Sequence, residues 1–162
     1  MKKAIFPGSF DPFTVGHEAL VQRSLKLFDE ITVAVGYNSE KRYMFDIDAR
    51  MKIVEKVFEN NHRVKVEAYS GLTIDLCRRL KTYFLIRGLR TASDFEFERA
   101  VGQINKQMEP LIETVFMLIA PEHSAVSSSI VRDILINSGD ASMFLPENVN
   151  INLWINNLQI NK

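Results

Sequence analysis

Short runs of apolar and β-branched residues alternate with longer stretches of helical periodicity along this chain. The runs cover residues 4–6, 31–35, 64–68, 83–86 and 114–119. Strands that alternate with helices pair in parallel, because each crossover returns the chain to the same end of the sheet. The pattern therefore predicts an α/β fold, a doubly wound Rossmann-like domain in which about five parallel strands carry helices on both faces.

Apolar residues at helical spacing fill the stretches between these runs. Beyond a helix near Val15, the predicted helices cover residues 50–58, 73–81, 93–108, 128–137 and 146–158. The chain has no internal repeat and no Pro-, Gly- or Ser-rich linker that would separate two domains. We therefore expect a single domain over residues 1–162, with helices at about residues 140–160 packed on it.

Twenty Lys and Arg residues balance twenty Asp and Glu residues, so the formal net charge is zero. Such a chain has no general attraction for nucleic acid or anionic membranes, and no apolar run reaches the roughly 18 residues of a membrane span. The single Cys77 excludes an intrachain disulfide and a Cys-rich zinc site. Because Pro7 and Gly8 come too early for a signal peptide, we expect a cytoplasmic protein that binds neither nucleic acid nor membrane.

Ligands of doubly wound sheets bind at the carboxyl ends of the strands, which directs attention to residues 7–17. Gly8 relieves crowding after the first strand, and Thr14 can cap the next helix and leave its N–H groups free to bind an anion. His17 in the first helical turn could donate a hydrogen bond to a phosphoryl oxygen. The alternative is a glycine-rich turn that carries a partly exposed surface histidine.

A second polar segment, residues 121–129, ends in Ser127, Ser128 and Ser129 at the predicted start of a helix. Two anion-binding helix starts beside one crevice suit a polyphosphate, although the serines could also serve only as helix caps. The chain lacks both G-x-G-x-x-G and G-x-x-x-x-G-K-S/T, so the dinucleotide and P-loop fingerprints are missing.

Basic residues follow two other predicted strands. Arg87 and Arg90 bracket Gly88, and Lys41 lies in a basic loop, where each could bind a phosphate or remain a solvated charge. Asp94 and Glu98 share one helical face, so they could pair with Arg90 or Arg99. Glu98 could instead accept a hydrogen bond from a ligand.

Several of these motifs resemble those of a known family. Residues 8–12 and 14–17 resemble the T/H-x-G-H signature of the nucleotidyltransferase superfamily, and residues 127–132 resemble its serine-rich signature. Residues 85–90, 94–98 and 144–149 are similar to bacterial phosphopantetheine adenylyltransferases. The sequence departs from the family pattern at Phe6, Ser9, Tyr43, Phe97 and His123.

The resemblance implies transfer of AMP from ATP to 4′-phosphopantetheine, which yields dephospho-coenzyme A and pyrophosphate. It implies Mg²⁺ held mainly by the ATP phosphates rather than by protein ligands, a homohexamer, and coenzyme A as a candidate inhibitor. His17 would stabilise the transition state. The acceptor would contact Ser9, Lys41, Thr73 and Arg87, and ATP would contact Ser9, Phe10, His17, Gly88, Leu89, Arg90, Glu98, His123, Ser124, Ala125, Val126, Ser127, Ser128 and Ser129.

Two other functions compete with this hypothesis. The chain could be another nucleotidyltransferase, acting on nicotinamide mononucleotide or transferring a cytidylyl group to a phosphoalcohol. It could also be a non-catalytic regulatory module that binds ATP, although such a binder needs fewer cations than Lys41, Arg87 and Arg90 supply beside His17.

Overall fold

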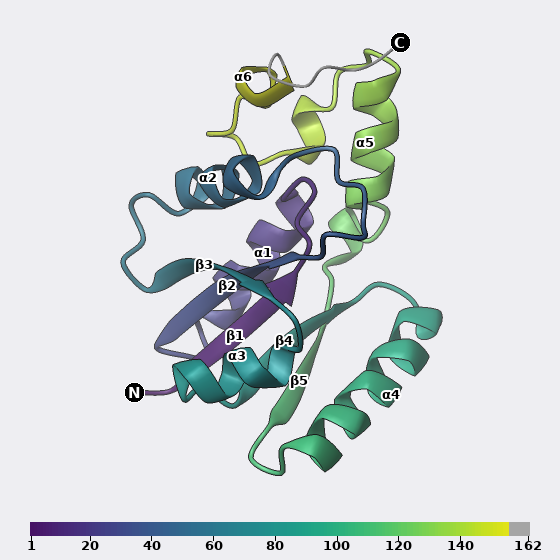
Figure 1. Ribbon diagram of the computed structural model, residues 1–162. Helices are drawn as coiled ribbons and strands as arrows, with labels where there is room; N and C mark the ends of the chain where they lie inside the picture. Colours follow the sequence, from purple (N-terminus) through teal and green to yellow (C-terminus); the bar gives the residue numbers. More distant parts are fainter. Residues whose placement is uncertain (156–162) are drawn as a thin grey trace.

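The computed structural model describes residues 1–155 of the chain. Five strands form one parallel sheet in the order β3-β2-β1-β4-β5 (Figure 1), which confirms the predicted fold class. The chain runs outward from β1 to β3 and then crosses back to β4, so the direction of winding reverses between β1 and β4. A crevice at their carboxyl ends is therefore where this architecture binds ligands. The strands are β1 (Lys3–Gly8), β2 (Glu30–Tyr37), β3 (Val64–Ser70), β4 (Phe84–Leu89) and β5 (Glu113–Leu118).

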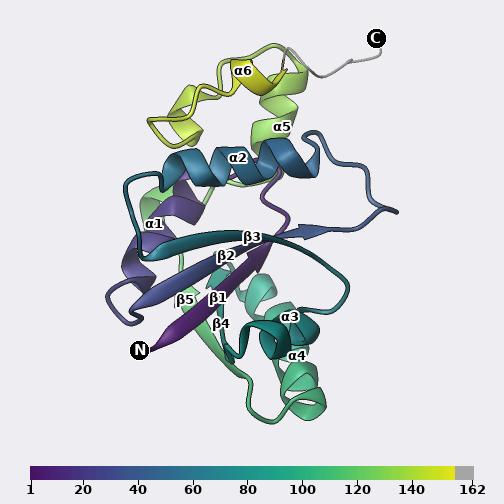
Figure 2. The same cartoon turned by 60° about the vertical axis from the view of Figure 1, so that its left-hand side comes forward.

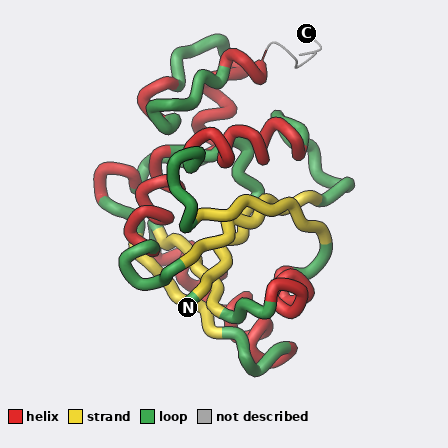
Figure 3. Tube along the Cα trace, turned by 90° about the vertical axis from the view of Figure 1, so that its left-hand side faces the viewer, coloured by secondary structure: helices red, strands yellow, loops and turns green. Residues whose placement is uncertain are grey.

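Helices cover both faces of the sheet. Figure 2 shows α1, α2 and α5 above the strands and α3 and α4 below them, and in Figure 3 the strands pass between these two groups. None of the described helices is long and apolar enough to cross a membrane. The helices are α1 (Val15–Ser24), α2 (Ile47–Val57), α3 (Thr73–Leu80), α4 (Ala92–Met108), α5 (Ser128–Ile136) and α6 (Asn152–Ile155), with single 3-10 turns at Pro121–His123 and Ser142–Phe144.

Two apolar cores lie on opposite faces of the sheet. Successive side chains of a strand point to opposite faces, so Ala4 and Phe6 join the larger core while Ile5 between them joins the smaller one. Cys77 of α3 packs in the smaller core, and burial raises the pKa of its thiol to about 11. The expectation from the sequence that Cys77 behaves as a small core residue is confirmed.

Several predicted boundaries are wrong. The first strand continues to Gly8, so Pro7 and Gly8 lie within β1 rather than after it. The fourth strand continues to Leu89, so Arg87 and Gly88 lie within β4 and pair with β5 rather than follow the strand. Residues 146–151 are not helical, and residues 156–158 of that prediction lie outside the described part of the chain. The Asn148 side chain donates to the Lys56 carbonyl oxygen across 2.7 Å, so a contact with α2 overrides the helical spacing.

Candidate active site

Two adjoining cavities open at the carboxyl ends of β1 and β4. The His17 cavity has a volume of about 310 Å³, and the Lys41 cavity has a volume of about 390 Å³. Both are lined by Pro7, Gly8, Ser9, Arg87 and Glu98. The shared residues make the end of β1 the place where molecules bound in the two cavities would meet.

His17 lies in the first turn of α1, three residues after the N-cap residue Thr14. The Thr14 backbone N–H donates to Nδ1 of His17 across 3.0 Å, and the Thr14 Oγ1 is also 3.0 Å from that nitrogen. A backbone N–H can only donate, so Nδ1 must be the acceptor. The neutral ring therefore carries its proton on Nε2, which is the donor that His17 can offer to a ligand.

The surroundings of His17 keep its ring neutral. The rings of Phe6, Phe10 and Phe13 lie with centroids 6.2, 5.1 and 5.2 Å from that of the imidazole. Burial, with a smaller contribution from the positive charge of Arg90, lowers the pKa of His17 to about 4. At neutral pH His17 is therefore an uncharged hydrogen-bond donor.

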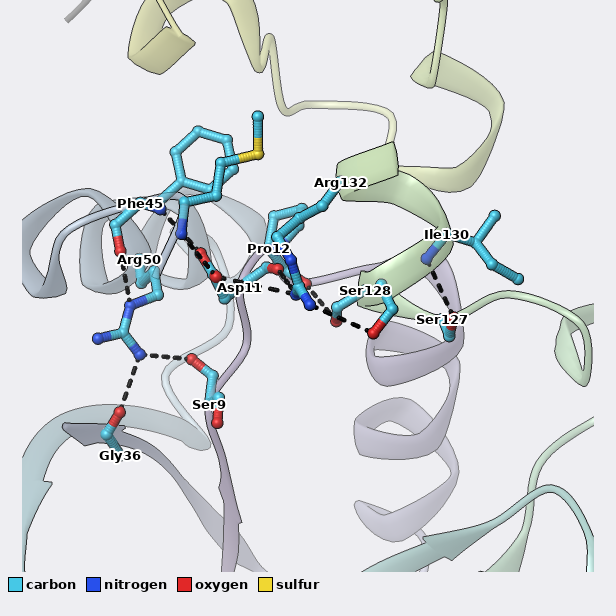
Figure 4. A network of polar contacts seen from close by, with 12 residues as sticks. Ser9, Asp11, Pro12, Gly36, Phe45, Arg50, Ser127, Ser128, Ile130 and Arg132 are labelled. Carbon is cyan, nitrogen blue, oxygen red and sulfur yellow. Dashed lines mark hydrogen bonds and ion pairs between the residues drawn. The ribbon is translucent and has the colours of Figure 1, made fainter. Parts of the chain in front are cut away.

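The serines at the start of α5 line the same cavity as His17, as the sequence pattern predicted. Ser127 caps the helix and accepts from the Ile130 N–H across 3.3 Å, and the Ser128 hydroxyl donates to the Pro12 carbonyl across 2.9 Å. Figure 4 shows how these contacts join α5 to the loop after β1. The N-terminal ends of α1 and α5 thus both border the His17 cavity, and each favours a bound anion.

Arg87 and Glu98 form an ion pair in the wall between the two cavities. The Arg87 Nε is 2.6 Å from the Glu98 Oε2, a second contact joins Nη2 to Oε1, and Nη1 donates to the Pro7 carbonyl across 2.9 Å. Of the two partners expected for Asp94, Arg90 and Arg99, the carboxylate pairs with Arg90. Glu98, however, pairs with Arg87 rather than with Arg90 or Arg99, because β4 extends far enough to bring Arg87 beside α4.

Lys41 and Thr73 line the second cavity with three tyrosines, Tyr37, Tyr43 and Tyr69. Lys41 is exposed and forms no ion pair with the described residues. The Thr73 and Tyr69 hydroxyls are 3.2 Å apart. The Lys41 cavity thus combines a cation with hydroxyl groups and aromatic rings, which suits a phosphorylated molecule with a polar chain.

Most, but not all, of the residues predicted to contact ATP line the His17 cavity. They are Ser9, Phe10, His17, Gly88, Arg90, Glu98, Val126, Ser127, Ser128 and Ser129. Leu89 does not line it, because its side chain is buried in the domain interior. His123, Ser124 and Ala125 lie in the adjacent segment between β5 and α5 and do not line it either.

Known proteins that resemble this chain identify its family. Residues 5–134 match the cytidylyltransferase-like family model. The phosphopantetheine adenylyltransferase of Flavobacterium psychrophilum is 50% identical over 93% of this chain and 99% of its own length. That of Bacteroides thetaiotaomicron is 43% identical over 94% of this chain and 100% of its own length. The chain belongs to the phosphopantetheine adenylyltransferase family.

Solved structures with the same fold are less similar to this chain in sequence than these relatives are. A Vibrio parahaemolyticus protein described as a nicotinate-nucleotide adenylyltransferase has a TM-score of 0.67 at 23% identity, over 90% of this chain and 94% of that one. A bifunctional NMN adenylyltransferase/ADP ribose pyrophosphatase from Francisella tularensis has a TM-score of 0.71 at 12% identity, over 93% of this chain and 46% of that one. These likenesses show a shared fold.

Two further residues, to which the sequence assigned no role, hold the loop after β1 in place. The buried Asp11 carboxylate accepts from the backbone N–H groups of Met44 and Phe45 across 2.9 and 2.8 Å, and its own backbone carbonyl accepts from Arg132 across 2.6 Å. Arg50 of α2 is fully buried beneath the same loop (Figure 4). A signal for Arg50 existed, because it stands at helical spacing with the apolar Ile53, Val54 and Val57 and so occupies the buried face.

Proposed function

We propose that this protein transfers AMP from ATP to 4′-phosphopantetheine and releases dephospho-coenzyme A and pyrophosphate. The observation that carries the proposal is the junction of two cavities at Ser9 and Arg87, with His17 and two helix starts on one side of it. ATP would occupy the His17 cavity and the acceptor would occupy the Lys41 cavity. The family membership of the chain supports the same reaction.

The reaction needs little covalent chemistry from the protein. An oxygen of the acceptor phosphate attacks the α-phosphorus of ATP, and the bond from that phosphorus to the bridging oxygen of the pyrophosphate breaks. The attacking phosphate is already an anion near neutral pH, so no general base is required. The rate then depends on alignment of the two substrates and on neutralisation of their charge.

The residues around the junction of the two cavities would supply this alignment and this neutralisation of charge. Lys41 and Arg87 would hold the acceptor phosphate, and Glu98 would keep the Arg87 guanidinium in a fixed orientation. His17 would donate from Nε2 to an oxygen of the α-phosphate as negative charge builds on it. The starts of α1 and α5, with Arg90, would favour the rest of the triphosphate.

Magnesium fits this site as an ion carried by the nucleotide. Within residues 1–155, no group of three His, Cys, Asp or Glu side chains is arranged to hold a metal ion. The buried Asp11 carboxylate is already occupied by two backbone N–H groups. Mg²⁺ retains water and binds phosphate oxygens readily, so we expect it on the triphosphate, where it would neutralise the charge of the leaving pyrophosphate.

The resemblance to the family extends the proposal to the assembly and to its place in the cell. We propose a cytoplasmic homohexamer that coenzyme A inhibits. Exposed apolar side chains on α4, including Phe97 and Ile104, support the proposal of a subunit interface, because α4 has no fully buried residue.

One assay tests the proposed reaction. The protein is mixed with ATP, Mg²⁺ and 4′-phosphopantetheine, and dephospho-coenzyme A and pyrophosphate are measured. Nicotinamide mononucleotide, and a phosphoalcohol with CTP, serve as competing substrates in parallel reactions. Product from either competitor alone would identify a different nucleotidyltransferase, and ATP binding without pyrophosphate from any acceptor would identify a regulatory module.

A further inference from the structure

The buried side chain of Arg50 connects three backbone segments near the two cavities. Its Nη1 donates to the carbonyl oxygens of Ser9 and Gly36 across 2.7 and 2.8 Å, and its Nε donates to that of Phe45 across 3.1 Å. The Tyr43 ring covers the guanidinium, with its centroid 4.0 Å from Cζ. Arg50 itself lines neither cavity.

Residues 9–11, which Arg50 contacts, adopt a backbone conformation that needs support from the surrounding structure. Phe10 has a φ of 49°, a left-handed conformation that costs an ordinary residue about 1 kcal/mol or more. The carbonyls on either side of it are both clamped by arginines, that of Ser9 by Arg50 and that of Asp11 by Arg132 (Figure 4). Strained backbone persists where such contacts over-determine it.

Burial of the Arg50 charge carries a cost in stability. Arg50 is fully buried, and its Nη2 has no hydrogen-bond partner in the described structure. Burial lowers the pKa of Arg50, although the nearby Asp11, Tyr43 and Asp46 partly oppose this shift. An apolar side chain of similar volume would avoid this cost, but it would remove the donor that Arg50 supplies to the carbonyls of Ser9, Gly36 and Phe45.

We propose that Arg50 is a positioning residue for adenylyl transfer. Through the Ser9 carbonyl it fixes residues 9–11 in the conformation that places Ser9 and Phe10 where the two cavities meet. Arg50 would touch neither substrate, so its effect falls on the alignment of the reacting groups rather than on the binding of the distant parts of each substrate. The inference rests on the proposed function.

Arg63 is exposed rather than buried, but it offers a control with the same kind of contacts at the other end of the sheet. It also donates to three backbone carbonyls, those of Leu25, Phe28 and Asp29, at 2.6, 2.7 and 2.9 Å. It lines neither cavity. The experiment compares Arg50→Lys and Arg50→Met with Arg63→Lys and Arg63→Met, and measures kcat, both KM values and the free energy of unfolding in urea.

We expect the Arg50 variants to lose about 10- to 100-fold in kcat while each KM changes by less than about threefold, because small misalignments cost rate more than binding. The Arg63 variants should keep kcat within about twofold of the wild type, even where their free energy of unfolding falls by as much as that of the Arg50 variants. The proposal would be overturned if the Arg50 and Arg63 variants lost kcat equally at equal stability. It would also be overturned if the Arg50 variants kept the wild-type kcat, or if neither of them folded.

A double-mutant cycle tests whether Arg50 acts through the Ser9 segment. In the Ser9→Ala background, Arg50→Lys should lower kcat by a smaller factor than in the wild type, since both changes affect one segment. If Arg50→Lys lowers kcat by the same factor in the wild type and in the Ser9→Ala background, the proposal is overturned. If the wild type itself forms no pyrophosphate, the proposed function fails; if it does and the Arg50 variants match it, only the positioning role fails.

Discussion

The backbone N–H of Thr14 donates a hydrogen bond to Nδ1 of His17, with the two nitrogens 3.0 Å apart. This one contact selects the tautomer of the imidazole, because it leaves Nε2 as the protonated nitrogen. Burial then keeps the ring uncharged by lowering its pKa to about 4. The helix start proposed to bind an anion thus also sets the chemical form in which His17 would meet a phosphate.

Replacement of His17 by Ala should lower kcat by roughly 10²- to 10³-fold, which is the usual loss when a donor to a developing oxyanion is removed. The fold should persist, because the ring lies at the edge of a cavity and not at the centre of a core. Steady-state pyrophosphate release measures the effect, and His62→Ala at an exposed position is the control. Turnover near the wild-type rate in His17→Ala would rule out the proposed role.

The lowered pKa of His17 also predicts how stability depends on pH. The unfolded chain takes up a proton on this ring near pH 6.5, whereas the folded protein resists protonation until about pH 4. The unfolded state therefore binds more protons in this window, and the free energy of unfolding falls as the pH is lowered from 6.5 towards 4. From this ring alone we expect a loss of about 2 kcal/mol between pH 7 and pH 5.

Urea unfolding of the wild type and of His17→Asn at several pH values isolates this contribution. Carboxylates also titrate towards pH 4, but they are common to both proteins and cancel in the difference. The gap between the two stability curves should narrow or reverse as the pH falls from 6.5 to 5. Parallel curves over that range would show that His17 titrates normally in the folded protein.

Strand and helix order were predictable because each depends on a periodic pattern that local physics imposes. The starts of α1 and α5 were also predictable, since Thr14 and Ser127 are residues that cap helices. The partners of Arg87 and the role of Arg50 were not readable, because they depend on which segments the tertiary fold brings together. The sequence placed Arg50 on an apolar helix face, but only the structure shows that it donates hydrogen bonds to three backbone carbonyls.

Lys41→Ala and Arg87→Ala should weaken the binding of 4′-phosphopantetheine more than that of ATP. Lys41 lines only the cavity proposed for the acceptor, and Arg87 lies in the wall between the two cavities. Loss of one charge-assisted contact corresponds to about 1.5–3 kcal/mol, or roughly a 10- to 150-fold rise in Kd. Titration calorimetry with each substrate measures this selectivity, with the exposed Lys52→Ala as the control. A larger effect on ATP would reject the assignment of the two cavities.

Glu98→Gln tests whether the carboxylate acts by orienting Arg87. The change keeps the size of the side chain but removes the charge that pairs with the guanidinium through two contacts. We expect weaker acceptor binding and, in the Arg87→Ala background, little further change from Glu98→Gln. The same calorimetric titrations measure both. Weaker ATP binding with normal acceptor binding would instead indicate a direct contact between Glu98 and the nucleotide.

Gly8→Ala should damage both stability and turnover, because a Cβ at this position would lie 2.7 Å from a Phe10 ring carbon. Phe10 cannot move away easily, since the rings of Phe6 and Phe13 pack against it. We expect a loss of about 1–3 kcal/mol in the free energy of unfolding, as for other overpacked sites, together with a lower kcat. Gly36→Ala is the control for stability, because the nearest neighbours of its Cβ would lie at an ordinary 3.5 Å. If both variants unfold at the same urea concentration as the wild type, the contact between Gly8 and Phe10 does not restrain the loop that carries Ser9.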